Sequence, residues 1–182
     1  MTDKVKVVLR DGSEVSLADW QKIYGLTVGS DQIGKYFSLN EARFKSDIAL
    51  YGELVVNELL MRVIDAFREE VGVPVTLNSF NRDIAHQLEL KKKGFKTATT
   101  SPHVVKMAAD IDTTSAKQTE EWVKVLLEVG NKLNITIRLG YDQYLAAGQT
   151  FIHVDVCPEY YGKGKPFFKQ QHPLAWASKI TW

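Results

Sequence analysis

The chain has 182 residues, 45% of them hydrophobic and 25% charged, with a formal net charge of +1 and one cysteine, Cys157. This length suits one well-cored domain with a small appendage, and the near-zero charge gives no general attraction to nucleic acid or to a membrane surface. A single cysteine excludes an intramolecular disulfide, and no apolar run reaches the roughly 18 residues that a membrane-spanning helix needs.

The first residues of the chain predict a hairpin followed by a short helix. Residues 4–10, KVKVVLR, are typical of a strand, and Asp11-Gly12 predicts the turn into a short returning strand, SEV. Ser16 is placed to cap a helix that ends at Gly25, and a loop should follow it.

This opening is interpreted as an appendage, residues 1–35, to a larger domain over 36–182. Its first segment, MTDKVKVVLRDGSEV, has no apolar core of the kind that signal peptides carry. We therefore expect the chain to be made in the cytoplasm, so that a role at the cell wall would require its later release.

The next segment predicts two helices. Ser38-Leu39-Asn40-Glu41 fits a capping box that starts a short helix. The clearest helical period of the chain covers 52–71 and is ended by Gly72 and Pro74. The apolar positions of this helix are Leu54, Val55, Leu59, Leu60, Val63, Ile64 and Phe67.

The remainder mixes strands and helices without strict alternation, which favours the α+β class. In chain order we expect a strand over 74–80, a helix over 82–94, a strand over 107–113, a helix from Ser115 to about Leu133, and strands over 135–142 and 150–156. The last residues, 157–182, are rich in aromatic side chains and show no clear period.

Two of the four histidines stand near carboxylates of predicted strands. His103 precedes a strand that carries Asp110, so a backbone reversal between them would bring both to one point. His153 and Asp155 are two apart on another strand and therefore share one face. Two imidazoles and one carboxylate with an open fourth position form a catalytic zinc arrangement. Spacing alone also allows a metal-free domain in which both histidines are packed or solvated.

Four motifs follow one another along 36–157: F-S-L-N-E from Phe37, S-F-N-R from Ser79, S-P-H-V-V-K-M-A-A-D from Ser101, and F-I-H-V-D from Phe151. Together they resemble peptidase family M15, the zinc peptidases that include D-alanyl-D-alanine carboxypeptidases and phage L-alanyl-D-glutamate endolysins. The family pattern is S-x-H-x-x-G-x-A-x-D, then a strand ending in H-[VI]-[DES], with S-G-Y-R and a phrase like F-[ST]-L-x-E upstream.

This resemblance implies a hedgehog/DD-peptidase-like α+β fold, in which a small mixed or antiparallel sheet is flanked by helices. It implies that His103, Asp110 and His153 hold zinc. It further implies that Arg82 binds a substrate carboxylate or steadies the developing oxyanion, and that Ser101 orients the site or contacts substrate. The implied activity is cleavage of peptidoglycan stem peptides, as a carboxypeptidase or an endopeptidase, with a phage or prophage origin as one option.

The chain departs from the family pattern at three places. Lys106 stands where the family has glycine, and Phe80-Asn81 replaces Gly-Tyr. The family's general base lies three or six residues before the last histidine, and those positions are Thr150 and Ala147 here. A threonine hydroxyl cannot take a proton from zinc-bound water near neutral pH, whereas a carboxylate can.

A general base must therefore come from elsewhere or be missing. Asp155 is the first candidate, although it could instead hold an imidazole in place. Asp142 and Glu159 are weaker candidates. If no base is present, the alternative is a catalytically silent domain of the same fold, in which zinc is structural and the surface binds cell wall or a protein partner.

Overall fold

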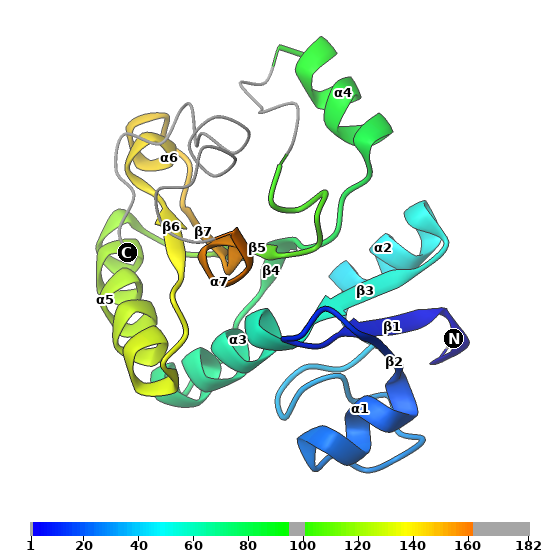
Figure 1. Cartoon of the computed structure of the whole chain (residues 1–182). Coiled ribbons are helices and arrows are strands. Elements are labelled where there is room, and N and C mark those ends of the chain that lie inside the picture. Colours follow the sequence, from blue (N-terminus) through cyan, green and yellow to red (C-terminus); the bar gives the residue numbers. More distant parts are fainter. Residues whose placement is uncertain (1, 95–100, 162–182) are drawn as a thin grey trace.

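The structure is a computed structural model that describes residues 2–94 and 101–161, where two small sheets are flanked by helices (Figure 1). The predicted α+β class is therefore confirmed. Within this part of the chain, no helix combines the length and the apolarity that crossing a bilayer requires. Residues 95–100 and most of the aromatic tail over 157–182 lie outside the described residues.

The first sheet contains the predicted hairpin and a third strand. Its members, in spatial order, are β2 (Glu14–Ser16), β1 (Val5–Val8) and β3 (Leu54–Asn57). Helix α1 (Leu17–Tyr24) follows the hairpin as predicted, because the Ser16 side chain accepts a hydrogen bond from the backbone N–H of Asp19. The helix ends at Gly25, whose φ of 73° is a left-handed conformation that glycine adopts without strain.

The N-terminal segment is joined to the rest of the chain through this sheet. Strand β1 pairs antiparallel with β2 and parallel with β3, which lies well beyond residue 35. Trp20 and Ile33 belong to the same cluster of buried apolar side chains as residues of the central helices. A boundary at residue 35 stays a prediction, and the parallel pairing is the contact that any such boundary would cross.

The prediction of one helix over 52–71 is wrong in its first part. Residues 54–57 form β3, and helix α3 (Glu58–Val71) begins only after Asn57, whose side chain accepts a hydrogen bond from the N–H of Leu60. All four residues of β3 are buried. A short apolar run can form either a helix or a strand, and here it forms a strand because it pairs with the edge of β1. The end of the helix at Gly72 is confirmed.

The capping box predicted at Ser38 is also wrong. Helix α2 (Ala42–Tyr51) begins after Glu41, and no side chain caps its first turn. Ser38 instead forms an isolated bridge with Gln32, and its carbonyl oxygen accepts the N–H of Glu41 in a turn. The backbone of Ser38 is thus committed to the preceding loop before the helix begins.

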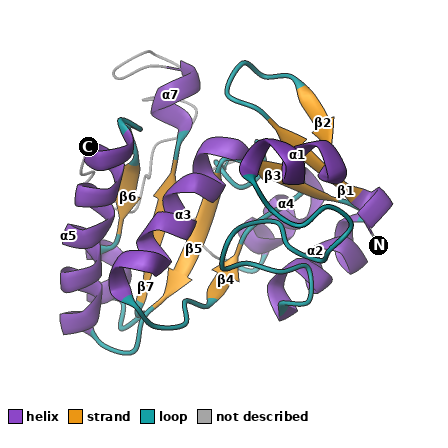
Figure 2. Cartoon of the chain, turned by 90° about the horizontal axis from the view of Figure 1, so that it is seen from below, coloured by secondary structure: helices purple, strands orange, loops and turns teal. Residues whose placement is uncertain are grey.

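The second sheet carries the candidate site. Its strands, in spatial order, are β4 (Leu77–Ser79), β5 (Ala108–Asp112), β7 (Phe151–Asp155) and β6 (Arg138–Gly140), and every pairing is antiparallel. Residues of one face, including Ile111 and Val154, join the apolar core with α3 and α5 (Ala116–Leu133). Figure 2 shows α3 lying over this sheet beside α5. The opposite face is polar.

Three short helices complete the described chain: α4 (Ile84–Lys92), α6 (Asp142–Ala146) and α7 (Cys157–Tyr161). Helix α4 confirms the helix predicted over 82–94, and Asp83 caps it by accepting the N–H of His86. Figure 1 shows α4 standing apart from both sheets. Helices α6 and α7 were not predicted, because five residues are too few to show a helical period.

Candidate metal centre

The pairing of β5 with β7 brings two of the predicted zinc ligands together. Asp110 and His153 are directly opposite each other in this antiparallel pair, so their side chains leave the sheet on the same face. The Nδ1 atom of His153 lies 2.9 Å from Oδ1 of Asp110.

His103 reaches the same point through the predicted backbone reversal. Residues 101–106 form consecutive turns, in which the N–H of Met107 donates to the carbonyl of Pro102. The Oγ of Ser101 accepts the N–H of His103 at 3.3 Å, so Ser101 supports the turn that presents the imidazole. The Nε2 atom of His103 then lies 3.1 Å from Oδ1 of Asp110.

Three potential ligand atoms therefore converge on one point. Each of His103, Asp110 and His153 offers one such atom, and these atoms all lie within 4.8 Å of one another. The three residues are buried, with 2%, 8% and 3% of their surfaces exposed. The structure thus brings together all three ligands that were predicted from the motifs.

The other nitrogen of each imidazole is held by a group outside this triad. In His103, Nδ1 donates to the carbonyl oxygen of Phe80 at 2.7 Å, which leaves Nε2 as an acceptor facing the triad. In His153, Nε2 lies 3.2 Å from Oδ2 of Asp155, so Nδ1 faces the triad. Metal-bound histidines are held in this way, since the partner of the far nitrogen sets which nitrogen is free to bind.

The charges of the triad suit a bound cation. Burial lowers the pKa of His103 and outweighs the opposing effect of Asp110, so this imidazole is neutral. Burial raises the pKa of Asp110, but the two histidines beside it lower that pKa further, to well below its ordinary value. The Nε2 lone pair of His103 and the Asp110 carboxylate are thus two acceptors 3.1 Å apart. Two acceptors repel at this distance, and a cation between them removes the repulsion.

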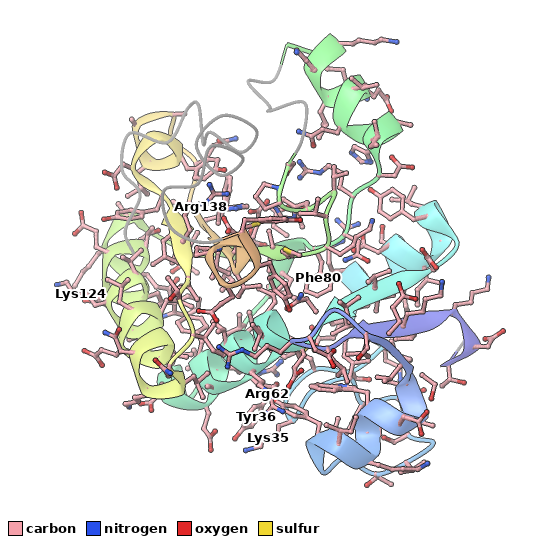
Figure 3. All side chains as sticks on the ribbon, in the orientation of Figure 1. Lys35, Tyr36, Arg62, Phe80, Lys124 and Arg138 are labelled. Atoms are coloured by element: carbon pink, nitrogen blue, oxygen red, sulfur yellow. The ribbon has the colours of Figure 1, made fainter. Side chains whose placement is uncertain are left out.

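Asp155 lies on the far side of His153 from Asp110. The carboxylate is fully buried, its Oδ2 accepts Nε of Arg138 at 2.7 Å, and its Oδ1 accepts the backbone N–H of Cys157 at 3.0 Å. These contacts suit a side chain that holds the imidazole. A role of Asp155 as general base stays a prediction. Arg138, labelled in Figure 3, was not selected from the sequence, and a lone arginine in the apolar segment ITIRLG was its only signal.

Arg82 lies beside the turn that carries His103. Its backbone N–H donates to the carbonyl of His103 at 3.3 Å. Its guanidinium donates to Oε1 of Gln87 at 2.8 Å and to Oγ of Ser79 at 3.0 Å. Arg82 is half-buried, and these two contacts orient its guanidinium.

Lys106 explains one departure from the motif. Its φ of 62° is left-handed, a conformation that favours glycine and that few other residues adopt. The chain accepts this strain, while Nζ of Lys106 donates to the carbonyl of Arg82 at 2.9 Å. Lys106 therefore lacks the conformational freedom of a glycine, but its side chain makes a hydrogen bond that connects the His103 turn to the backbone of Arg82.

Asn81 explains the second departure. Its side chain accepts the N–H of Val55 at 2.8 Å and donates to the carbonyl of Val55 at 2.9 Å, as a strand partner would. Its own N–H donates to the carboxylate of Asp47 at 2.8 Å. These contacts hold the segment in which the neighbouring carbonyl of Phe80 meets His103.

The described structure supplies no acid at the two positions of the family's general base, Thr150 and Ala147. Glu159 is turned elsewhere, since it accepts the N–H of Thr136 at 2.6 Å and pairs with Arg10 at 2.8 Å. Asp142 is the first residue of α6.

Two residues on the polar face were missed at the sequence level. Asp112 is two residues after Asp110 on β5 and pairs with Phe151, so it shares the ligand face. Burial, followed by the charge of Asp110, raises its pKa. Tyr144 of α6 is buried against Phe151, with ring centroids 3.8 Å apart. The alternation in A-D-I-D could have indicated Asp112.

No protein-family model matches the chain, and no curated protein matches its sequence. Among solved structures, the chain is similar to the L-Ala D-Glu endopeptidase ChiX of Serratia marcescens. The similarity has a TM-score of 0.51 and 18% sequence identity, and it covers 69% of this chain and 99% of ChiX. At this identity the comparison establishes a shared fold, and it confirms the DD-peptidase-like α+β architecture that the motifs implied.

Proposed function

We propose that the protein is a zinc-dependent peptidase that cleaves peptidoglycan stem peptides. The convergence of His103, Asp110 and His153 within 4.8 Å carries this proposal, because it supplies two imidazole nitrogens and one carboxylate oxygen at a single buried point. The similarity to the fold of an L-Ala D-Glu endopeptidase supports the choice of substrate class.

Bound zinc would polarise the scissile carbonyl and lower the pKa of a bound water to about 7. The chain's own residues would do the rest. Arg82, oriented by Gln87 and Ser79, would bind a substrate carboxylate or the developing oxyanion through its forked guanidinium. Ser101 would keep the His103 turn in place rather than touch substrate, since it is itself buried.

We assign the proton-accepting role to Asp112. It shares the ligand face with Asp110 and His153, is only partly buried, and has a pKa raised by burial and by the charge of Asp110. Asp155 is fully buried and already accepts N–H groups from Arg138 and Cys157. A carboxylate that is partly open has the freedom to accept a proton and release it again.

A catalytically silent domain is the second candidate. The absence of an acid at Thr150 and Ala147 favours it, as do the contacts that occupy Asp155. In this alternative zinc is structural, and the domain binds cell wall or a protein partner.

Metal analysis and peptidoglycan digestion separate the two candidates. The purified protein should hold about one zinc per chain, and His103→Ala should lose it while keeping the fold. His86→Ala is the matched control, because His86 lies on α4 and contacts Tyr51 of α2, outside the triad. The wild-type protein should release stem-peptide fragments, and Asp112→Asn should keep zinc but lose most activity.

Each outcome decides between named alternatives. Full zinc occupancy without any fragment release would favour the silent domain. A wild-type protein that binds no zinc would refute both candidates in favour of a metal-free domain. Undiminished turnover by Asp112→Asn would refute the assignment of the base.

A further inference from the structure

We propose that Arg138 is a positioning residue of the metal centre, and that it acts through Asp155 to point Nδ1 of His153 at the metal. This inference rests on the proposed function only in taking zinc as the bound metal. The orientation of the imidazole can be tested whether or not the protein is a peptidase.

Strand order makes this contact possible. Arg138 of β6 is directly opposite Asp155 of β7, and β7 lies between β6 and the strand that carries Asp110. Arg138 and Asp155 each have 0% of their surface exposed. An arginine side chain is rarely placed in such an interior unless a carboxylate neutralises it, so the two charges depend on each other.

The hydrogen bonds around Asp155 favour one orientation of the His153 imidazole. Arg138 Nε–H and the backbone N–H of Cys157 are both obligatory donors, at 2.7 Å and 3.0 Å from the carboxylate. Nε2 of His153 lies 3.2 Å from Oδ2 of the same carboxylate and can donate a hydrogen to it. The neutral imidazole is then left with its lone pair on Nδ1, the atom 2.9 Å from Asp110.

A contact that favours one position of the ring hydrogen matters more for His153 than for His103. The far nitrogen of His103 meets the backbone carbonyl of Phe80, which can only accept. His153 has a carboxylate at each ring nitrogen, Asp110 at Nδ1 and Asp155 at Nε2. Either nitrogen could therefore carry the hydrogen. Arg138 and the backbone N–H of Cys157 hold both oxygens of Asp155 in place beside Nε2, and this fixed contact favours the orientation in which Nδ1 faces Asp110.

A double-mutant cycle on zinc affinity tests this chain of contacts. Asp155→Asn should weaken zinc binding by about 10-fold to 100-fold, as loss of a partner that orients a ligand does. Arg138→Met should weaken binding to a similar degree. Because Arg138 acts through Asp155, adding Arg138→Met to Asp155→Asn should produce little further loss. Affinity is measured by competition with a chromophoric chelator.

Two variants guard against a loss of folding. The double variant R138M/D155N removes both buried charges together, which buried pairs tolerate better than loss of one partner. Arg138→Lys keeps the charge and should restore part of the affinity. Arg68→Met is the control, since Arg68 pairs with Glu41 at 3.5 Å, outside the metal centre. It should leave the affinity unchanged.

Nitrogen-15 NMR of the His153 ring gives a readout that a merely structural role would not move. At a pH where the imidazole is neutral, the metal-free wild-type protein should show hydrogen on Nε2, and Asp155→Asn should weaken this preference. Unchanged affinity in Asp155→Asn would overturn the proposal, as would an equal effect of Arg138→Met in both backgrounds.

Failure of the proposed function can be told apart from failure of this inference. Zinc binding with the expected cycle but without peptidase activity would refute only the peptidase. If the wild-type protein takes up no zinc, the position of the hydrogen on the His153 ring of the metal-free protein still tests this inference. Hydrogen on Nε2 at a pH where the imidazole is neutral supports the positioning by Asp155, and hydrogen on Nδ1 overturns it.

Discussion

Replacing Asp47 with alanine is expected to be among the more damaging single changes outside the metal centre. Asp47 is a fully buried carboxylate of α2, and Nη2 of Arg43 lies 2.6 Å from it. Its other oxygen accepts the N–H of Asn81 at 2.8 Å. The variant removes the partner of both groups at once.

The magnitude follows from burial. Breaking a buried ion pair by removing one partner costs about 3–5 kcal/mol. Arg43 keeps 23% of its side chain exposed, so water partly replaces the lost carboxylate and the lower end applies. We expect Asp47→Ala to lower the free energy of unfolding by about 3 kcal/mol, and Tm by about 6–12 °C for a chain of this size.

Glu89→Ala is the matched control. Glu89 and Lys93 form an ion pair at 2.7 Å, nearly the same distance, but their side chains are 60% and 61% exposed. Such an exposed helical pair contributes only about 0.3–0.5 kcal/mol. Because burial also raises the pKa of Asp47, the double variant D47A/R43M should cost less than Asp47→Ala alone.

Urea titration and thermal melting, both followed by circular dichroism, measure these differences. We expect burial, rather than the distance between the charged atoms, to determine how much an ion pair stabilises the fold. Equal costs for Asp47→Ala and Glu89→Ala would refute it. A double variant that is less stable than Asp47→Ala would refute the expectation that the uncompensated charge of Arg43 causes the larger part of the cost.

Three further predictions concern other parts of the molecule. Gly34→Ala should cost about 1–3 kcal/mol, because an added Cβ would lie 2.7 Å from the carboxylate of Asp65; an unchanged urea midpoint would show that this carboxylate can move aside. Lys106→Val should cost about 2 kcal/mol while Lys106→Gly changes little, since a β-branched residue resists a φ of 62°; equal stability of the two variants would contradict this. The rise in Tm caused by zinc should grow as the pH is raised above the ordinary histidine pKa of about 6.5. Burial lowers the pKa of His153, but its hydrogen bonds to two carboxylates raise it above the ordinary value, and this imidazole must lose a proton to bind metal. In the metal-free protein the sign is opposite, because the stability from protonated His153 is complete below the unfolded pKa and lost as pH rises through the folded pKa. Calorimetry with and without zinc measures both trends, and a zinc-induced rise that is the same at every pH would contradict them.

Local features of the chain were predicted well where one residue decides the backbone. Ser16 and Ser115 cap helices because their hydroxyls accept the N–H three residues later, and Gly72 ends α3 with a φ of 65°. These contacts need only neighbouring residues, so the sequence is enough to find them.

The secondary-structure predictions failed where pairing with a distant segment of the chain determined the backbone conformation. Residues 54–57 carry a helical period, but they pair with β1, whose residues lie almost 50 positions earlier. Ser38 fits a helix cap, but its bridge to Gln32 takes its backbone into a loop. A local pattern states only which elements are possible, and tertiary pairing selects among them.

The candidate site likewise has features that the sequence predicted and features that depend on tertiary pairing. The sequence alone was sufficient to name His103, Asp110 and His153, because strand alternation puts His153 and Asp155 on one face and the motif order relates them to His103. Only the tertiary structure decided which nitrogen of each imidazole faces the other two residues of the triad. That choice depends on Phe80 and Asp155, which lie at the far nitrogens of the two rings, and on Arg138, which the order of strands in the second sheet places against Asp155. Sequence spacing governs which side chains share a face, whereas a hydrogen bond between strands requires the register in which the whole sheet pairs.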